Sequence, residues 1–254
     1  MKNYCPLFFL SLSLYGVPNI PVGSNALYFL QTQSVDCTNL RLHLGCGEGH
    51  LNGYINIDFA PDEHPLQSKS GADFWANITQ LSFPANTVTE VRSHHTFEHF
   101  NRQIALALVA GWSYWLKDAG IVTIETPDFH ESMKQLLSND YTYTQKQVIM
   151  RHVFGSHEAS WANHYDGWYD EKFVHVLTAF GFVIQDCQKT GYLNLRNITV
   201  QARKERTLSL TELKTIGHTL LAENMTDQST SEQGLWQIWC NEFDRALDVL
   251  CQCS

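Results

Sequence analysis

The sequence reads Leu40-Arg41-Leu42-His43-Leu44-Gly45-Cys46-Gly47-Glu48-Gly49 at the point that decides its fold. Leucines alternate with polar residues in the first half of this stretch, which predicts a half-buried strand, and glycines follow the strand directly. A second alternating run, from Ile55 to Asp58, ends in a carboxylate. This order of strand, glycine loop, strand and acid is typical of a site for a nucleotide-type cofactor.

The glycine spacing distinguishes between cofactor classes. A dinucleotide site needs a third glycine, at the position of His50, and a helix whose N-terminus holds the pyrophosphate. Only residues 46–53 join the two strands, which leaves room for one helical turn at most. A phosphate-binding loop is excluded, because no Gly-Lys-Ser/Thr follows the glycines. S-adenosylmethionine fits better than NAD, because its sulfonium needs no anion-binding helix and Asp58 can accept hydrogen bonds from ribose hydroxyls.

Composition excludes one class of partner and indicates a compartment. The chain of 254 residues has a net charge of −9 and no basic stripe, so we expect no nucleic-acid partner. Its seven cysteines are scattered without a Cys-x-x-Cys pair, which fits a reducing cytosol and predicts a cytoplasmic protein. A weaker alternative is a targeting signal, because the apolar residues 6–15 resemble a signal-peptide core. That run is too short to span a membrane, and no stable membrane insertion is expected.

Helical and strand patterns alternate through the middle of the chain. Gly120 is suited to the left-handed position after a helix that covers residues 97–116. We predict an α/β fold: a Rossmann-like three-layer sandwich with a mostly parallel seven-stranded sheet and a C-terminal helical extension. Further helices are predicted near residues 130–138, 143–153 and after Asp170, and further strands at residues 88–92, 121–125, 182–184 and 193–202.

The ends of the predicted strands indicate where a ligand would bind. In open α/β sheets, ligands lie at the carboxyl ends of the strands. In this chain those ends are residues 45–49, Asp58, residues 93–95 and residues 126–128. The sequence therefore predicts that these four segments converge on one site.

Two Ser-x-x-Glu capping boxes, at Ser209 and Ser229, predict two amphipathic helices near the C-terminus. These helices either pack on the rest of the chain or provide the surface of a homodimer. The predicted organisation is an N-terminal extension (residues 1–39), a cofactor-binding domain (residues 40–205) and a C-terminal helical appendage (residues 206–254).

Several short motifs follow the glycine loop in a specific order. They are Gly53-Tyr54-Ile55-Asn56-Ile57-Asp58, Leu81-Ser82-Phe83-Pro84, Phe97-Glu98-His99, Leu116-Lys117-Asp118-Ala119-Gly120, Glu125-Thr126-Pro127-Asp128-Phe129 and the segment 164–182. With Leu-Gly-Cys-Gly at residues 44–47, they make the chain resemble a class I S-adenosylmethionine-dependent methyltransferase over about residues 40–203. The resemblance implies methyl transfer from S-adenosyl-L-methionine to an oxygen or nitrogen of a small-molecule or glycan acceptor.

The resemblance assigns roles to the residues of the cofactor site. Asp58 would hold the ribose, with Phe59 beside the adenine. Asn77 stands where the family usually has an aspartate near the adenine amino group, and an amide oxygen can still accept that bond. The methionine part of the cofactor would be wrapped by Gly45, Cys46, Gly47 and Gly49, and the methyl group and substrate would be faced by His94 and His95.

Transfer to oxygen or nitrogen can require a general base, and histidine suits that role near neutral pH. The candidates, in order, are His95, His94 and His164, and a purely structural role is the alternative for His95 and His164.

We expect no metal ion. Some quinone-type O-methyltransferases of similar sequence place a cation near a Glu-x-x-Glu-His run, whose first position is His95 here. The alternative is that Glu98 only stabilises a helix N-terminus.

Two other functions compete with methyl transfer. One is a non-catalytic methyltransferase-like module that presents its helical tail to a partner, which Asn77 and the altered turn at residues 117–120 favour. The other is an NAD-dependent oxidoreductase, which the missing third glycine disfavours.

Overall fold

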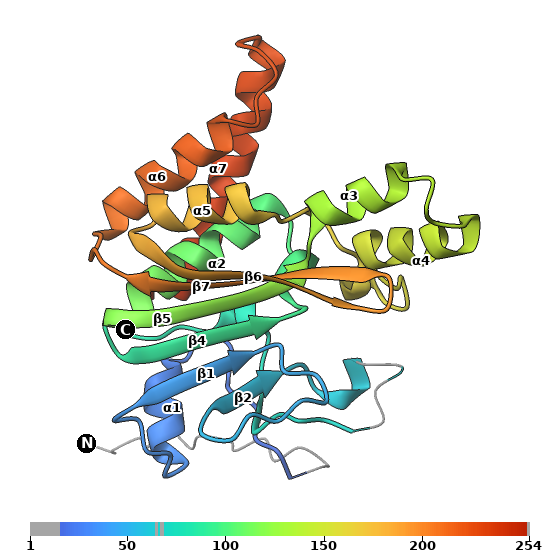
Figure 1. The fold of residues 1–254 in the computed structure, drawn as a ribbon. Helices are drawn as coiled ribbons and strands as arrows, with labels where there is room; N and C mark the ends of the chain where they lie inside the picture. The colour runs from blue at the N-terminus through green and yellow to red at the C-terminus, as the bar shows by residue number, and fades with distance from the viewer. Residues whose placement is uncertain (1–15, 64–65, 67–68, 253–254) are drawn as a thin grey trace, which may run out of the picture.

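The computed structural model describes residues 16–63, 66 and 69–252. The strands are β1 (Leu40–Leu44), β2 (Ile55–Asp58), β3 (Phe74–Trp75), β4 (Val88–His94), β5 (Leu116–Pro127), β6 (Phe182–Tyr192) and β7 (Leu195–Lys204). They form a seven-stranded sheet in the order β3-β2-β1-β4-β5-β7-β6 (Figure 1). Pairs from β3 to β5 are parallel, whereas β7 runs antiparallel to both neighbours. The predicted Rossmann-like α/β fold with a mostly parallel sheet is confirmed.

Apart from the first, the helices lie close to the positions that the sequence predicts. They are α1 (Ala26–Thr32), α2 (Arg102–Trp115), α3 (Phe129–Leu137), α4 (Tyr143–Phe154), α5 (Asp170–Ala179), α6 (Leu210–Ala222) and α7 (Thr230–Leu250). The helix predicted from residue 97 begins with a separate 3-10 turn, η3 (Phe97–His99). Ser209 and Ser229 both cap their helices, but only Ser209 forms the reciprocal capping box, because the Glu232 side chain accepts from the Thr226 N–H instead.

Only one face of the sheet is apolar. Strand residues alternate between faces, and register aligns Leu42 of β1 with Val91 of β4 and Val122 of β5, all buried. The adjacent row is polar across the same strands and includes His43, Arg92, Thr123 and Gln201. The alternation therefore directs the helices to the apolar face.

Helices α1, α2 and α5 follow this division and share one apolar cluster with the buried row. The three-layer arrangement stays a prediction. The Phe29 ring of α1 packs edge-on against Phe74 of the apolar face. On the same face, the Ser113 hydroxyl of α2 donates to the Phe180 carbonyl after α5, at 2.8 Å. Three links, between β1 and β2, between β2 and β3, and between β3 and β4, contain only turns and 3-10 helices in the described residues. In the described residues, these links add no α-helix to the polar face.

The turn between α2 and β5 differs from its prediction. The left-handed residue is Ala119, with φ 59°, and not Gly120. A Cβ at Gly120 would lie 2.8 Å from the Lys117 carbonyl oxygen. Glycine is therefore required at position 120, where two backbone segments approach closely. The turn lies within β5, which begins directly after α2 at Leu116.

Both terminal segments share the core of the central domain. Leu30 of α1 and Phe243 of α7 are completely buried in the same apolar cluster. The Trp115 indole of α2 donates to the Leu250 carbonyl at the end of α7, at 2.7 Å. The tail helices thus pack on the domain, and α6 and α7 also project beyond it at the top of Figure 1. A homodimer through these helices stays a prediction, as do the domain boundaries.

Within the described part of the chain, no helix combines the length and apolarity that a membrane span requires. The signal-like residues 6–15 lie outside the described residues.

We predict opposite effects for two helical glycines. A Cβ at Gly217 of α6 would overlap the buried Phe243 ring of α7, whereas a Cβ at Gly234 of α7 would meet nothing within 4 Å. Gly217→Ala should destabilise the fold by about 1–3 kcal/mol through overpacking. Gly234→Ala should stabilise it by about 0.5–1 kcal/mol through helix propensity. Urea unfolding of both variants would test the docking of α6 on α7, and stabilisation by both would contradict it.

Candidate functional site

The glycine loop after β1 is held directly against the carboxylate after β2. The Gly45 N–H donates to the Ile57 carbonyl at 2.8 Å, and the Gly47 N–H donates to the Asp58 carboxylate. The other carboxylate oxygen accepts from the Phe59 N–H at 2.7 Å. Gly45 and Gly47 have positive φ angles, which glycine adopts without strain. The loop and the acid that the sequence singled out therefore form one unit at the edge of the sheet.

Thr96 joins this unit to the end of β4. Its hydroxyl lies 3.0 Å from the Gly45 carbonyl and 3.1 Å from the His94 carbonyl. A Cβ at Gly45 would overlap the Thr96 side chain. The carboxyl ends of β1, β2 and β4 thus meet, as predicted for parallel neighbours.

The other predicted cofactor residues lie around the same loop. Cys46 is buried, and burial raises the pKa of its thiol. Gly49 contacts Gly71, whose N–H donates to the Gly47 carbonyl at 2.9 Å and so supports the loop from behind. Asn77 is exposed after β3, and its side-chain oxygen accepts from the Thr79 N–H and hydroxyl at 3.0 and 2.8 Å. That oxygen therefore serves as a helix cap in this structure.

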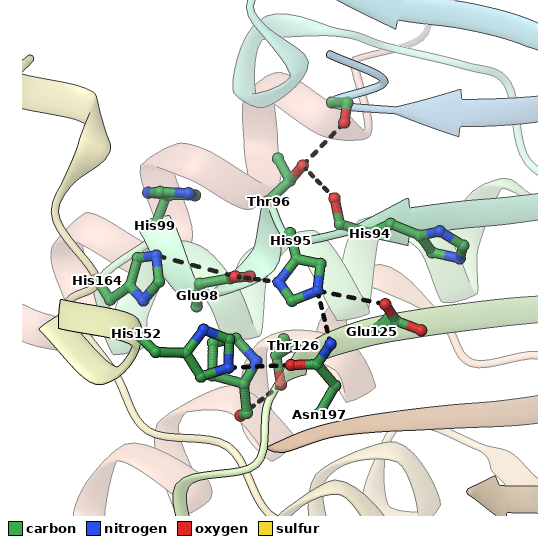
Figure 2. Close-up of polar contacts among 12 residues, drawn as sticks. His94, His95, Thr96, Glu98, His99, Glu125, Thr126, His152, His164 and Asn197 are labelled. Atoms are coloured by element: carbon green, nitrogen blue, oxygen red, sulfur yellow. Dashed lines mark hydrogen bonds and ion pairs between the residues drawn. The ribbon is translucent and has the colours of Figure 1, made fainter. Parts of the chain in front are cut away.

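A cavity of about 430 Å³ lies beside the ends of β4 and β5. Its walls include Glu98 and four histidines, contributed by the end of β4, η3, α4 and the loop after α4: His95, His99, His152 and His164. Figure 2 shows these imidazoles gathered around the Glu98 carboxylate. A larger cavity, of about 640 Å³, is lined mainly by α5 and the loop before it, and contains none of the predicted site residues.

The loop after α4 also reaches the segment that follows β2. The Trp161 indole, which lines the cavity, donates to the Glu63 carbonyl at 2.7 Å. Glu63 ends the 3-10 turn η1 (Pro61–Glu63), shortly after Asp58 and Phe59. The cavity and the glycine loop are therefore adjacent regions of one site.

His95 lies between two carboxylates. Its Nδ1 is 3.3 Å from Glu98 Oε1 and its Nε2 is 3.3 Å from Glu125 Oε1 (Figure 2). Burial opposes the charge of His95, but the hydrogen bonds to Glu125 and Glu98 outweigh burial and raise its pKa to about 10. The bond to His95 also lowers the pKa of Glu125 to about 2. His95 is therefore an imidazolium at neutral pH, and a proton acceptor only after it releases that proton.

His164 and His94 are neutral at the same pH. Burial lowers the pKa of His164 to about 4, although Glu98 lies nearby. Burial and the Arg92 guanidinium lower the pKa of His94 to about 4. The structure brings His164 and His95 together in the cavity, whereas His94 lies on the polar sheet face, where its Nε2 accepts from Arg92 Nε at 2.7 Å. The catalytic roles of all three histidines stay predictions.

The sequence did not single out Glu125, His152 or Asn197 as site residues. Asn197 contacts both His95 Nε2, at 3.2 Å, and His152 Nε2, at 3.0 Å. Glu125 ends a strongly β-branched run. Its alignment with His94 follows from the register between β4 and β5, which the sequence does not give. His152 and Asn197 come from distant segments, and no local pattern marks them.

Several solved structures have a similar fold at low identity. A SAM-dependent methyltransferase of Methanosarcina mazei is 16% identical, with a TM-score of 0.43, over 69% of this chain and 97% of that chain. Magnesium protoporphyrin IX methyltransferase of Synechocystis, with bound SAH, is 12% identical, with a TM-score of 0.43, over 70% and 80%. An S-adenosylmethionine-dependent methyltransferase of Mesorhizobium loti is 13% identical, with a TM-score of 0.42, over 72% and 99%. Searches with protein-family models and against curated proteins give no match. At these identities and TM-scores, neither activity nor acceptor follows from the similarity.

We predict that Gly45→Ala is more destabilising than Gly53→Ala. Both glycines have left-handed φ angles, of 72° and 81°, so alanine costs about 1–2 kcal/mol at either position. At Gly45 the added Cβ also overlaps Thr96, whereas at Gly53 the nearest side-chain atom is 3.8 Å away. The overlap should add about 1–3 kcal/mol, measured as the difference in urea unfolding free energy. Equal losses would show that the contact with Thr96 is not tight.

Proposed function

We propose that the chain is an S-adenosylmethionine-dependent methyltransferase that acts on an oxygen or nitrogen of a small-molecule or saccharide acceptor. The observation that carries this proposal is the contact between the Gly47 N–H and the Asp58 carboxylate. It places a glycine loop and an acid side by side at the ends of adjacent parallel strands. The carboxylate retains lone pairs with which it can accept ribose hydroxyls, because each oxygen accepts more than one hydrogen bond.

The absence of a helix after the glycine loop supports this cofactor class. Between β1 and β2 the described chain forms only turns. A pyrophosphate would lack the helix N-terminus that dinucleotide sites supply. The methionine end of the proposed cofactor needs only close backbone approach, which Gly45 and Gly47 permit.

The cavity of about 430 Å³ is the proposed acceptor site. Its volume lies within the range of small-molecule sites, roughly 300–1,000 Å³. Trp161 provides an aromatic wall on which a flat or sugar-like group can stack. The hydrogen bond from Trp161 to the Glu63 carbonyl supports placing this wall beside the cofactor.

Methyl transfer is an in-line displacement, so alignment of donor and acceptor supplies most of the proposed catalysis, about 7–11 kcal/mol in favourable cases. If the acceptor loses a proton, a neutral imidazole must receive it. His164 is neutral and lines the cavity, whereas His95 is charged in its pair of carboxylates. In the metal-free chain, His164 therefore fits the base role, and His95 fits the role of holding an acceptor oxygen.

We predict that Asp58→Asn weakens binding of the demethylated cofactor, S-adenosylhomocysteine. Hydrogen bonds to a charged group contribute about 1.5–3 kcal/mol, so the Kd should rise by at least about tenfold. Asn is nearly isosteric and can still accept from the Gly47 N–H, so the loop should keep its conformation. Isothermal titration calorimetry on the full chain would measure the effect, with circular dichroism to confirm folding.

Asp248→Asn is the matched control. Asp248 pairs with Lys214 at 2.7 Å between α6 and α7. Its substitution should therefore leave cofactor binding unchanged. No heat from the unmodified chain with either S-adenosylmethionine or its demethylated product would refute the proposal. Binding of NAD in their place would favour the oxidoreductase alternative.

A further inference from the structure

The cavity contains a group of donors suited to a metal ion. One ligand atom each from Glu98, His99 and His164 can be chosen so that all three lie within 4.8 Å of one another. Glu98 and His99 belong to η3, and His164 comes from the loop after α4. The backbone holds these segments together, because the Tyr165 N–H donates to the Glu98 carbonyl at 2.9 Å.

Two of these residues have polar atoms that the protein leaves without a partner. Among the described residues, Glu98 Oε2 and His164 Nδ1 are buried and form no hydrogen bond. The Glu98 residue is only 2% exposed. An unpaired carboxylate oxygen at this depth costs free energy unless a cation or donor meets it. His95 Nδ1 and His164 Nε2 approach the other oxygen, Oε1, at 3.3 and 3.9 Å, so Oε2 remains for a further ligand.

The third donor has the orientation of a metal-binding histidine. His99 Nδ1 lies 3.2 Å from the Asn163 carbonyl oxygen, to which it can only donate. This bond fixes the tautomer that leaves a lone pair on Nε2. Metal-ligating histidines commonly donate their second ring nitrogen to a carbonyl in this way. The His99 and His164 rings lie 4.6 Å apart, nearly perpendicular to each other.

We propose that Glu98, His99 and His164 bind a divalent transition-metal ion of the zinc type. Two imidazoles and one carboxylate are a donor set that suits zinc and neighbouring first-row ions better than magnesium, which prefers oxygen ligands. The carboxylate of Glu98 is turned into the histidine cluster (Figure 2). This orientation argues against the alternative that Glu98 only stabilises a helix N-terminus. This site replaces the expectation of a metal-free centre.

Three protein ligands leave a coordination position open toward the cavity. Such a position takes water or a substrate oxygen, and the ion polarises the group that it binds. The identity of the fourth ligand alone rests on the proposed function, in which this ligand would be an oxygen atom of the methyl acceptor. The metal site itself stands on its donors and would remain without that function.

Zinc binding to the purified full-length chain tests the proposal. The chain is treated with a chelator, equilibrated with zinc chloride and desalted, and its bound zinc is counted by mass spectrometry. We expect one high-affinity zinc ion per chain that is lost in Glu98→Gln and His164→Ala. The affinity should fall by more than about 100-fold in each, since changes outside the first coordination shell alone cost about 10–100-fold.

His152→Gln is the matched control from the same cavity. His152 Nε2 already contacts the Arg196 carbonyl and Asn197 Oδ1, at 3.2 and 3.0 Å, so this imidazole is not among the proposed ligands. The control should bind zinc as the unmodified chain does. Zinc that binds all variants equally, or no zinc at all, would overturn the proposal.

Two further variants keep the outcome decisive. Because Glu98 is buried, Glu98→Gln can fail to fold, and His99→Ala then removes a less buried ligand, with circular dichroism to confirm folding. Asp58→Asn should lose the demethylated cofactor and still bind one zinc ion. A chain that binds zinc without any cofactor would refute the proposed function and leave the metal site intact.

Discussion

The alternation of apolar and polar residues along β1, β4 and β5 is the constraint on which the rest of the structure depends. One row, represented by Leu42, Val91 and Val122, is fully buried, and the row beside it carries His43, Arg92 and Thr123. Burial of apolar area drives helices onto the first row and offers no gain on the second. Helices α1, α2 and α5 therefore pack on the first row, and the polar groups remain for the opposite face and for the ends of the strands.

The site at those ends is organised by buried negative charge. Glu98 is almost completely removed from water, and a buried carboxylate needs opposite charge or hydrogen bonds to remain ionised. His95 supplies one such partner and is itself held by Glu125 on the other side. The charge states follow from this arrangement: the histidine between two acids is protonated, whereas His164, buried without a direct hydrogen bond to an acid, is neutral.

The sequence predicted the contact between the glycine loop and Asp58, but not the residues of the cavity. The glycine loop and Asp58 lie within one short segment, so local spacing is enough to pair them. Asn77 was placed by resemblance, and its side-chain oxygen serves as a cap for Thr79. His94 and His95 are adjacent in sequence, yet alternation along the strand and the left-handed φ of 49° at His95 send their side chains to different surroundings.

By itself, the sequence determined the elements, their order and the glycine loop, because strand alternation, helix periodicity and capping residues are local signals. Tertiary structure alone decided that α1, α2 and α5 share the apolar face of the sheet, since that packing joins segments that are far apart in the chain. It also decided which histidines surround Glu98. His152 and His164 lie more than 50 residues along the chain from this acid. Only the packing of α4 and its following loop on η3 brings their imidazoles into one cavity.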